Sequence, residues 1–568
     1  MVITSKQNWL LSSLMGSLLL AGCSLAPEYQ PAKVIVPVKF KESDPKLEDN
    51  NWKIAQPADQ QTRGEWWRIY NDAQLNELEQ QAIAGNQNLK AVAANIQASR
   101  ALRSAAQAER LPSIDAGFGP TRQKPSPASL GLDDNAHTSA QTLWRAQANV
   151  SYELDLFGRV ASSVNAATAD LQQQEALYQS ALLALQADVA QGYFLIRQLD
   201  TEQAIYNRTI KLLGETRDLM QLRFKNGLGS ELDVSRAQTE LATAQTTALN
   251  IARNRASAEH ALAVLLGKPP ADFNLAVQPL TANSIRLPAG LPSTLLERRP
   301  DIAAAERAMA ADNARIGIAR AAFFPKLSLT GALGYESSSL SELGKWSSRT
   351  FLLGPVAGTI LSLPLFDGGQ RKAGVAQARA AYEESVANYR QTVLNAFREV
   401  ENGLSDQRIL DQQIQAQNQA LSSSRHANQL SHLRYREGAI SYLDVIDSDR
   451  TILQQEQLAA QLKGSQIIAS INLIRALGAV GVVNKKSALR RFFYIHKLFC
   501  IYREFCTNSF NFCFYISNNF FVTFAVNHVS DPTSKFTNFS FTKTTSCYCW
   551  STDTDTRSHK WRTWIIWN

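Results

Sequence analysis

Cysteine is almost absent from most of this chain. Of its 568 residues, six are cysteine, and Cys23 is the only one before residue 481. A body with one cysteine has no disulfide framework and no thiolate metal site. Long apolar runs are also missing, since no stretch beyond the first twenty-odd residues is apolar enough for a membrane-spanning helix. If the chain crosses a membrane, it must do so with strands closed into a β-barrel, because open strands leave backbone groups unsatisfied in lipid.

The net charge of +8 does not indicate a nucleic-acid-binding protein. Residues 481–568 carry seven of these positive charges and Lys6 carries the eighth, so residues 23–480 are neutral. No basic patch with interleaved aromatic residues occurs in that neutral body. We therefore expect no nucleic-acid partner.

The sequence also lacks the patterns of a catalytic or metal site. Four histidines lie in the body at no metal-ligand spacing: His137, His260, His426 and His432. No nucleophile elbow or phosphate loop is present, because Gly227-Leu228-Gly229 lacks the rest of a nucleotide fingerprint and follows a predicted helix. We expect a protein that is not an enzyme and has no metal or cofactor.

The N-terminus has the pattern of an export signal. Lys6 precedes an apolar run over residues 9–20, which is too short for a stable anchor. The run ends in Leu-Ala-Gly-Cys at residues 20–23, which resembles the lipobox at which bacterial lipoproteins are acylated and cleaved. We predict a lipoprotein signal peptide over residues 1–22 and covalent lipid on Cys23, which anchors the chain in outer-membrane lipid. The alternative is an ordinary signal peptide followed by a chance cysteine.

The rest of the sequence contains an internal repeat. Residues 223–234 (RFKNGLGSELDV) and 434–445 (RYREGAISYLDV) match at every landmark, some 211 residues apart. Leu156-Phe157-Gly158 likewise pairs with residues 365–369, and residues 111–114 pair with 324–327. Three landmarks in the same order at nearly the same offset indicate two copies of one unit.

Each copy predicts the same succession of elements. A helical run comes first, then two strands, and then a long helical hairpin. In the first copy, 72–290, we place these at 72–110, at 113–123 with 143–157, and at 159–267. In the second copy, 291–480, we place them at 293–322, at 326–336 with 350–364 (strand region 326–366), and at 371–478. Residues 23–71 form a separate N-terminal segment.

The hairpins are predicted from missing proline and a heptad-like seam. No proline lies between Pro127 and Pro269 or between Pro364 and Pro532. Apolar residues step by four and three from Tyr382 to Val400. A continuous helix over residues 159–226 would reach roughly 100 Å at 1.5 Å per residue. These segments therefore form coiled-coil hairpins.

These landmarks carry a family resemblance. Residues 66–72 (WWRIYND), the Leu-Phe-Asp-Gly-Gly step at 365–369, the repeated hairpin tips and residues 473–478 (LIRALG) are similar to the TolC-like outer membrane factor family. Within it, the chain resembles the lipidated OprM-like (NodT-type) multidrug efflux channels from Cys23 to about Gly478. The resemblance implies an α+β membrane protein that forms a homotrimer. Each chain would give four strands to a shared transmembrane β-barrel in the outer membrane and its long helices to a periplasmic α-helical barrel.

The resemblance also implies a gate at the periplasmic hairpin tips. Leu443, Asp447 and Arg450 match the positions that close OprM-like channels, with Asp447 as a candidate ion-pair partner of an arginine on a neighbouring hairpin. The competing interpretation is a solvated helix face. Asp233 and Asp444 match the gate-tip aspartates of the wider family, but Ser-x-x-Asp spacing also fits helix capping boxes.

The predicted function is passive conduction of drugs or other small molecules through the exit channel of a tripartite efflux pump. The implied partners are a periplasmic adaptor protein and an inner-membrane transporter of the resistance-nodulation-division type. Two alternatives stay open: the duct of a type I protein secretion system, and a structural periplasmic coiled-coil lipoprotein.

The last part of the chain, residues 481–568, has a different character. It holds thirteen of 24 phenylalanines and five of six cysteines, without repeat, heptads or clear alternation. We interpret it as a frameshift or read-through product of the gene's end. The alternative is an appended cysteine-rich module.

Overall fold

The computed structural model describes residues 25–37, 39–42, 64–133, 135–281, 285, 298–353 and 361–479. These lie in the first of two units, Met1–Val483, and the second, Asn484–Asn568, contains no described residue. The predicted signal peptide, Cys23 and the tail therefore fall outside the described residues. No described helix is both long enough and apolar enough to cross a membrane.

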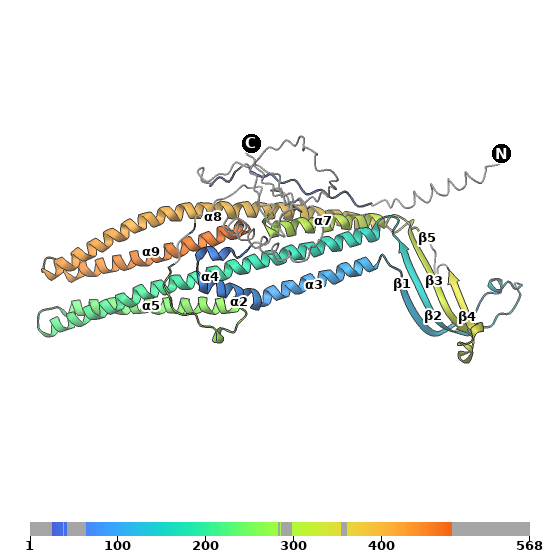
Figure 1. The fold of residues 1–568 in the computed structure, drawn as a ribbon, viewed down its shortest axis with the longest axis horizontal. Helices are drawn as coiled ribbons and strands as arrows, with labels where there is room; N and C mark the ends of the chain where they lie inside the picture. Colours follow the sequence, from blue (N-terminus) through green and yellow to red (C-terminus); the bar gives the residue numbers. More distant parts are fainter. Residues whose placement is uncertain are drawn as a thin grey trace, which may run out of the picture. The chain divides into compact units, whose positions relative to one another are not determined.

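The first copy of the repeat contains helices, two strands and a long hairpin (Figure 1). Its elements are η2 (Trp66–Tyr70), α2 (Ala73–Gly85), α3 (Gln87–Ala108), β1 (Ser113–Gln123), η3 (Ala128–Leu130), β2 (Gln141–Leu154), α4 (Arg159–Lys225), α5 (Glu231–Leu265) and η4 (Pro270–Asp272). The α4–α5 pair occupies the segment in which proline is missing. Because each residue adds 1.5 Å to a helix, the 67 residues of α4 separate the strands from the hairpin turn by roughly 100 Å.

The second copy repeats this order. Its elements are α7 (Pro300–Ala321), β3 (Lys326–Ser337), η5 (Leu340–Glu342), η6 (Trp346–Ser348), β4 (Arg349–Leu353), β5 (Leu361–Ser362), α8 (Gln370–Arg436) and α9 (Tyr442–Ala476). Helices α4 and α8 have the same length, as do α5 and α9. Residues 293–297 of the predicted helical run 293–322 lie outside the described residues.

The predicted helical run 72–110 consists of two helices, α2 and α3. The chain is extended at Asn86, whose side chain accepts a hydrogen bond from the Leu89 N–H at 2.8 Å and donates to the Leu265 carbonyl at 2.9 Å. A Cβ on Gly85 would meet the Leu266 carbonyl oxygen at 2.2 Å. The break thus lets the α2–α3 junction pack directly on the end of α5.

The strands form one antiparallel sheet in the order β1-β2-β3-β4, and β5 also pairs with β3. The two copies join where β2 pairs with β3, from Trp144–Ser337 to Leu154–Leu327. The predicted strand 350–364 corresponds to β4 and β5, with residues 354–360 between them outside the described part. The mostly helical chain with one small sheet confirms the α+β prediction.

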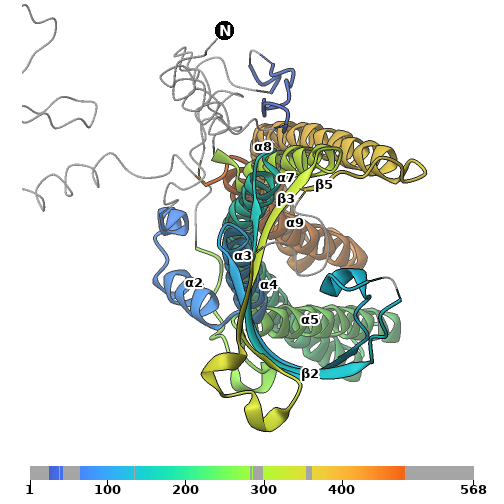
Figure 2. The same ribbon diagram turned by 90° about the vertical axis from the view of Figure 1, so that its right-hand side faces the viewer.

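The helices form layers alongside α4 and α8 (Figures 1 and 2). Helix α4 packs against α3, α5, α7 and α9, whereas α8 packs against α7 and α9. The two hairpins, α4–α5 and α8–α9, therefore meet mainly through α4 and α9.

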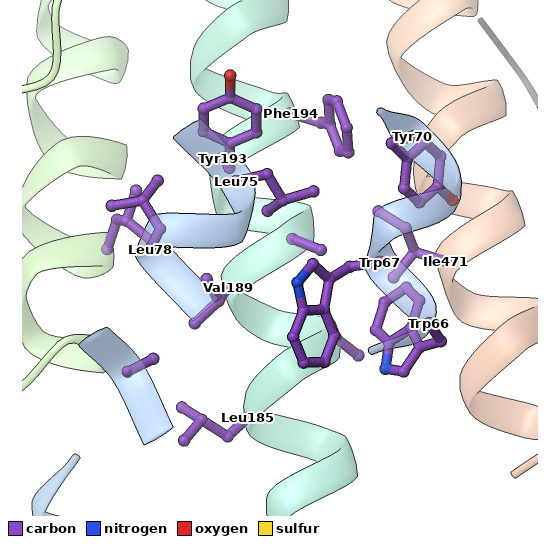
Figure 3. Close-up of a cluster of buried hydrophobic side chains, with 14 of the residues drawn as sticks. Trp66, Trp67, Tyr70, Leu75, Leu78, Leu185, Val189, Tyr193, Phe194 and Ile471 are labelled. Carbon is purple, nitrogen blue, oxygen red and sulfur yellow. The ribbon is translucent and has the colours of Figure 1, made fainter. Parts of the chain in front are cut away.

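The largest core lies where η2 and α2 pack between the two hairpins (Figure 3). Trp66 and Trp67 are each 2% exposed, and their rings meet edge to face at 6.0 Å. Tyr70 packs on Phe194 of α4 with ring centroids 5.0 Å apart. Burying such aromatic groups dominates the energy of a core, so the Trp-Trp motif fixes α4 and α9 together.

Several polar atoms of the same motif form hydrogen bonds, whereas the buried Trp67 Nε1 has no partner among the described residues. The Trp66 Nε1 donates to Gln186 at 3.1 Å, and the Tyr70 hydroxyl hydrogen-bonds the Ser470 hydroxyl of α9 at 2.6 Å. Asp72 caps α2 by accepting from the N–H groups of residues 74 and 75. The motif thus acts as a structural wedge.

Residues 25–37 and 39–42 form an N-terminal strap along α7 and α8. The Tyr29 hydroxyl donates to Glu306 of α7 at 2.6 Å, and the backbone N–H of Lys41 donates to Glu401 of α8 at 2.8 Å. Phe40, 1% exposed, fills the core between these helices. A Cβ on Gly317 would lie 2.7 Å from the Ala26 Cβ, so the strap lies against bare helix backbone there.

Candidate functional site: the hairpin tips

Both hairpin tips use the same turn. Gly227 (φ +68°) follows the end of α4 and Gly438 (φ +75°) follows the end of α8, both in the left-handed region that favours glycine. The Leu228 N–H donates to the Arg223 carbonyl at 2.8 Å, and the matching bond from Ala439 to Arg434 is 2.9 Å. These bonds, with those of the glycine N–H groups, form Schellman motifs that satisfy the last carbonyls of each helix. The repeated sequence therefore encodes a repeated turn.

Asp444 is a helix-capping residue. Its carboxylate accepts from the Ser441 N–H at 2.9 Å, which completes a capping box at the start of α9. In the first copy the box is incomplete, because the Ser230 hydroxyl oxygen accepts from the Leu232 N–H instead. Among the described residues, the Asp233 carboxylate has no hydrogen bond or ion pair. The capping interpretation is thus confirmed for Asp444 and wrong for Asp233.

An apolar cluster joins the two tips. Met220 of α4 and Ala237 of α5 pack against Tyr442, Val445 and Ile446 of α9. Tyr442 is 5% exposed, and burial raises its pKa to about 12. This cluster, which we call the tip core, buries residues from both hairpins of one chain, so separating the hairpins would expose it to water.

An ion pair lies beside the tip core. The Arg450 guanidinium of α9 makes two hydrogen bonds to the Glu240 carboxylate of α5, of which the Nε–Oε2 bond is 2.9 Å. The same guanidinium lies 3.6 Å from the Asp447 carboxylate one turn earlier. Side chains of Arg450 and Asp447 are 52% and 64% exposed, whereas Glu240 is 12% exposed. Arg450 thus bridges the two hairpins of one chain, while Asp447 faces outward.

Glu240 was missed by sequence reasoning. It lies in mid-helix on α5, without a motif, and its equivalent in the second copy is Thr451. Arg450 has Thr239 as its equivalent. A search for charges present in only one copy would have found both partners.

Leu443 has a different environment. It is 40% exposed on the tip of α9, and its first-copy equivalent Leu232 is 56% exposed. Apolar side chains left open at the end of a hairpin are available to other chains. The assignment of Leu443, Asp447 and Arg450 to a gate stays a prediction.

Polar groups join the hairpins further along α4 and α9. Glu456 of α9 pairs with Arg208 of α4 and with Arg425 of α8, the latter at 3.0 Å. Glu202 of α4, 3% exposed, accepts hydrogen bonds from Gln457 and Gln461 at 3.1 Å each. Hydrogen bonds therefore continue the α4–α9 contact away from the tip.

A buried ionic network fixes the loop that follows α5. Asp200 of α4 is 1% exposed and accepts from Arg197 at 3.1 Å and from Arg255 at 2.6 Å. It also accepts from the Gln278 backbone N–H at 3.0 Å. The network is fully paired at Asp200, as a buried charge requires. No group of three or more acidic, histidine or cysteine side chains fit to hold a metal is found in the described part of the chain.

A family model described as "Outer membrane efflux protein" matches residues 78–268 and 291–479, once in each copy of the repeat. The chain belongs to this family, whose members are channels. It is the outer-membrane component of an efflux pump, and it extends into the periplasm.

Individual relatives agree. The toluene efflux pump outer membrane protein TtgC of Pseudomonas putida is 33% identical over 478 residues, which cover 83% of this chain and 95% of the relative. The cation efflux system protein CusC of Escherichia coli is 31% identical over 471 residues, covering 81% and 97%. The solved outer-membrane channel OprN superposes with a TM-score of 0.72 at 29% identity, covering 81% of this chain and all of that one. The open-state MtrE channel of Neisseria gonorrhoeae gives 0.68 at 29% identity, covering 80% and 98%.

Proposed function

We propose that this protein forms a homotrimeric exit duct of a tripartite efflux pump, and that its periplasmic end is held closed by the Arg450–Glu240 bridge and the tip core. The duct is not an enzyme and conducts small molecules passively. A periplasmic adaptor and an inner-membrane transporter of the resistance-nodulation-division type supply the docking and the energy. Relatives named for toluene, antibiotics and cations support a duct that leaves selection to the transporter.

One observation carries the closing mechanism: a single guanidinium joins α9 of the second hairpin to α5 of the first. In a duct lined by hairpins, widening the end requires one hairpin of each chain to move away from the other. The bridge and the tip core both oppose that movement. We therefore assign the closed state to these contacts.

The bridge can shift the opening equilibrium measurably. A partly exposed ion pair contributes up to about 1 kcal/mol. Three copies in a trimer that open together sum to about 3 kcal/mol, or about a 100-fold change in the ratio of open to closed channels. Asp447 contributes less, because its carboxylate is exposed and 3.6 Å from Arg450.

Single-channel conductance in planar bilayers tests the mechanism. The wild type is expected to be mostly closed, and Arg450→Gln and Glu240→Gln are each expected to raise the open fraction. The exchanged pair, Arg450→Glu with Glu240→Arg, is expected to restore closure. Arg434→Gln is the matched control, because Arg434 is an exposed tip cation without an ion pair to any described residue.

The outcomes separate the channel from its gate. If Arg450→Gln and Glu240→Gln both leave the open fraction unchanged, the protein is still a duct but the bridge is not part of its gate. A rise in Arg434→Gln as large as in Arg450→Gln would mean that pore charge alone controls opening. No conductance from folded trimer would favour a structural coiled-coil lipoprotein.

Lipid on Cys23 is a second part of the proposal. Cys23 comes two residues before Leu25, where the strap meets the strand-proximal end of α7. Anchoring there would hold the strap at the level at which the strands begin. Metabolic labelling with palmitate, lost in Cys23→Ser, is the expected result, and labelling that persists in the variant would refute it.

A further inference from the structure

An open cavity of about 530 Å³ lies where α7 ends and α8 begins, beside the first residues of the strap. Phe323 and Phe324 line it from the end of α7, and Leu25 lines it from the strap. Helix α7 leads directly into β3, and α8 begins shortly after β5 (Figure 1). The cavity is therefore at the strand end of the helices, the opposite end from the hairpin tips.

Three cations line this cavity, and no carboxylate does: Arg320, Lys372 and Arg379. Lys372 and Arg379 are seven residues apart on α8, so they lie on one face of the helix. Both are exposed, and neither has an ion pair to a described residue. Arg320 donates to the Leu25 carbonyl at 3.3 Å. The cavity thus gathers positive charge that the fold does not neutralise.

The adjacent Arg371 shows what a structural cation looks like here. Its Nε donates to the Asp367 carboxylate at 2.5 Å, and its guanidinium also donates to the Pro364 carbonyl. The hydrogen bonds of Arg371 therefore stabilise the turn that starts α8. Lys372 and Arg379 have no comparable structural role.

The repeat supplies an internal comparison. In the first copy, the positions equivalent to Arg320, Lys372 and Arg379 are Gln107, Ala161 and Thr168. Helices α3 and α4, which are equivalent to α7 and α8, pack together there without any of the three charges. The cations are therefore not needed to pack these helices.

Several apolar side chains at this end of α7 and α8 are exposed to solvent in the single chain. Leu365 and Phe366, just before α8, are 88% and 90% exposed, and Phe323 is 45% exposed. In water such exposure would be unfavourable, whereas acyl chains would cover these groups. Inside the cavity itself, the exposed rings of Phe323 and Phe324 lie with the cations. Cations beside exposed apolar side chains match a phospholipid, whose phosphate is anionic and whose chains are apolar.

We propose that this cavity binds the phosphate group of an anionic phospholipid, with Lys372 and Arg379 contacting the phosphate and the exposed rings of Phe323 and Phe324 contacting the acyl chains. Charge-assisted hydrogen bonds from lysine and arginine to phosphate oxygens give such a site its preference for anionic headgroups. The site would fix the rotation and depth of the duct in its leaflet, next to the strap that follows Cys23.

Native mass spectrometry of the full acylated trimer tests the proposal. The protein is released from nanodiscs of phosphatidylglycerol and phosphatidylethanolamine, and the retained lipids are identified. The wild type is expected to retain phosphatidylglycerol preferentially. Each charge removed in Lys372→Gln and Arg379→Gln is expected to lower that preference about fivefold, and the double variant about 25-fold. Arg390→Gln on the same helix is the matched control, since Arg390 is exposed and lies outside the cavity.

Competition distinguishes a lipid from a free anion. Inorganic phosphate at millimolar concentration is expected not to displace the retained lipid, because it makes no contact with the apolar side chains that line the cavity. Displacement by phosphate alone would overturn the lipid assignment. Equal retention in the double variant, or an equal loss in Arg390→Gln, would refute the role of the two cations. Trimer content and thermal midpoint, measured in parallel, show that the variants remain folded.

Discussion

Glu79 on α2 carries a carboxyl group into an apolar core. It is 0% exposed, and neither carboxyl oxygen has a hydrogen-bond partner among the described residues. Burial raises its pKa to about 9, because the charged form loses its hydration. We predict that Glu79 is protonated at neutral pH and makes the fold less stable as pH rises.

The sign follows from the two states of the group. The unfolded pKa is near 4.5 and the folded pKa is about 9, so the folded state holds the proton more tightly. The stability is fully present below pH 4.5 and falls as pH rises toward 9. The slope is about 1.4 kcal/mol per pH unit, so the free energy of unfolding should fall by about 4 kcal/mol between pH 5 and pH 8.

Thermal unfolding between pH 5 and pH 9 measures this loss. Glu79→Gln has a similar shape but does not titrate, so its midpoint should depend less on pH than that of the wild type. Glu77→Gln on the same helix is the control, because Glu77 is exposed and should leave the pH dependence unchanged. Parallel pH curves for wild type and Glu79→Gln would refute a neutral, buried carboxyl group.

Three further predictions concern stability. Asp200→Ala leaves its two arginine partners without their shared carboxylate and should lower the free energy of unfolding by about 3–5 kcal/mol, which thermal or denaturant unfolding would show. Gly317→Ala places a Cβ 2.7 Å from Ala26, so hydrogen exchange of residues 25–42 should accelerate, and unchanged exchange would mean that the strap adapts. Gly438→Ala should lower the free energy of unfolding by about 1 kcal/mol, because alanine is strained at the positive φ of this position. Gly214→Ala, in mid-helix with open space around it, should raise the free energy of unfolding by a similar amount. Equal effects of the two variants would refute the turn argument.

Much of the fold could be predicted because local signals and the repeat agree. β1 covers residues 113–123, as the alternation predicted, and the long helices occupy the segments without proline. The break at Gly85 and Asn86 has a local signal, because a glycine precedes an asparagine that caps α3, but its packing partner is tertiary. The Asn86 side chain donates a hydrogen bond to the carbonyl of Leu265, some 180 residues later, and local propensity cannot predict such a distant partner.

At the candidate site, too, local contacts could be predicted from the sequence and tertiary contacts could not. The capping role of Asp444 follows from the Ser-x-x-Asp spacing alone, because both partners lie within one turn. The partner of Arg450 does not, because Glu240 lies 210 residues away and belongs to the other hairpin. The same spacing at Ser230 and Asp233 gives only half a box, so the spacing alone does not determine whether the second hydrogen bond forms.

The two copies of the repeat separate structural from functional residues. Some groups that build the fold recur in both copies, as Gly227 and Gly438 do at the turns. Arg450 and Glu240 occur in one copy only, facing Thr239 and Thr451 at the equivalent positions. Divergence at these positions makes one hairpin distinct from the other, which supports the proposal that one hairpin of each chain moves when the duct opens.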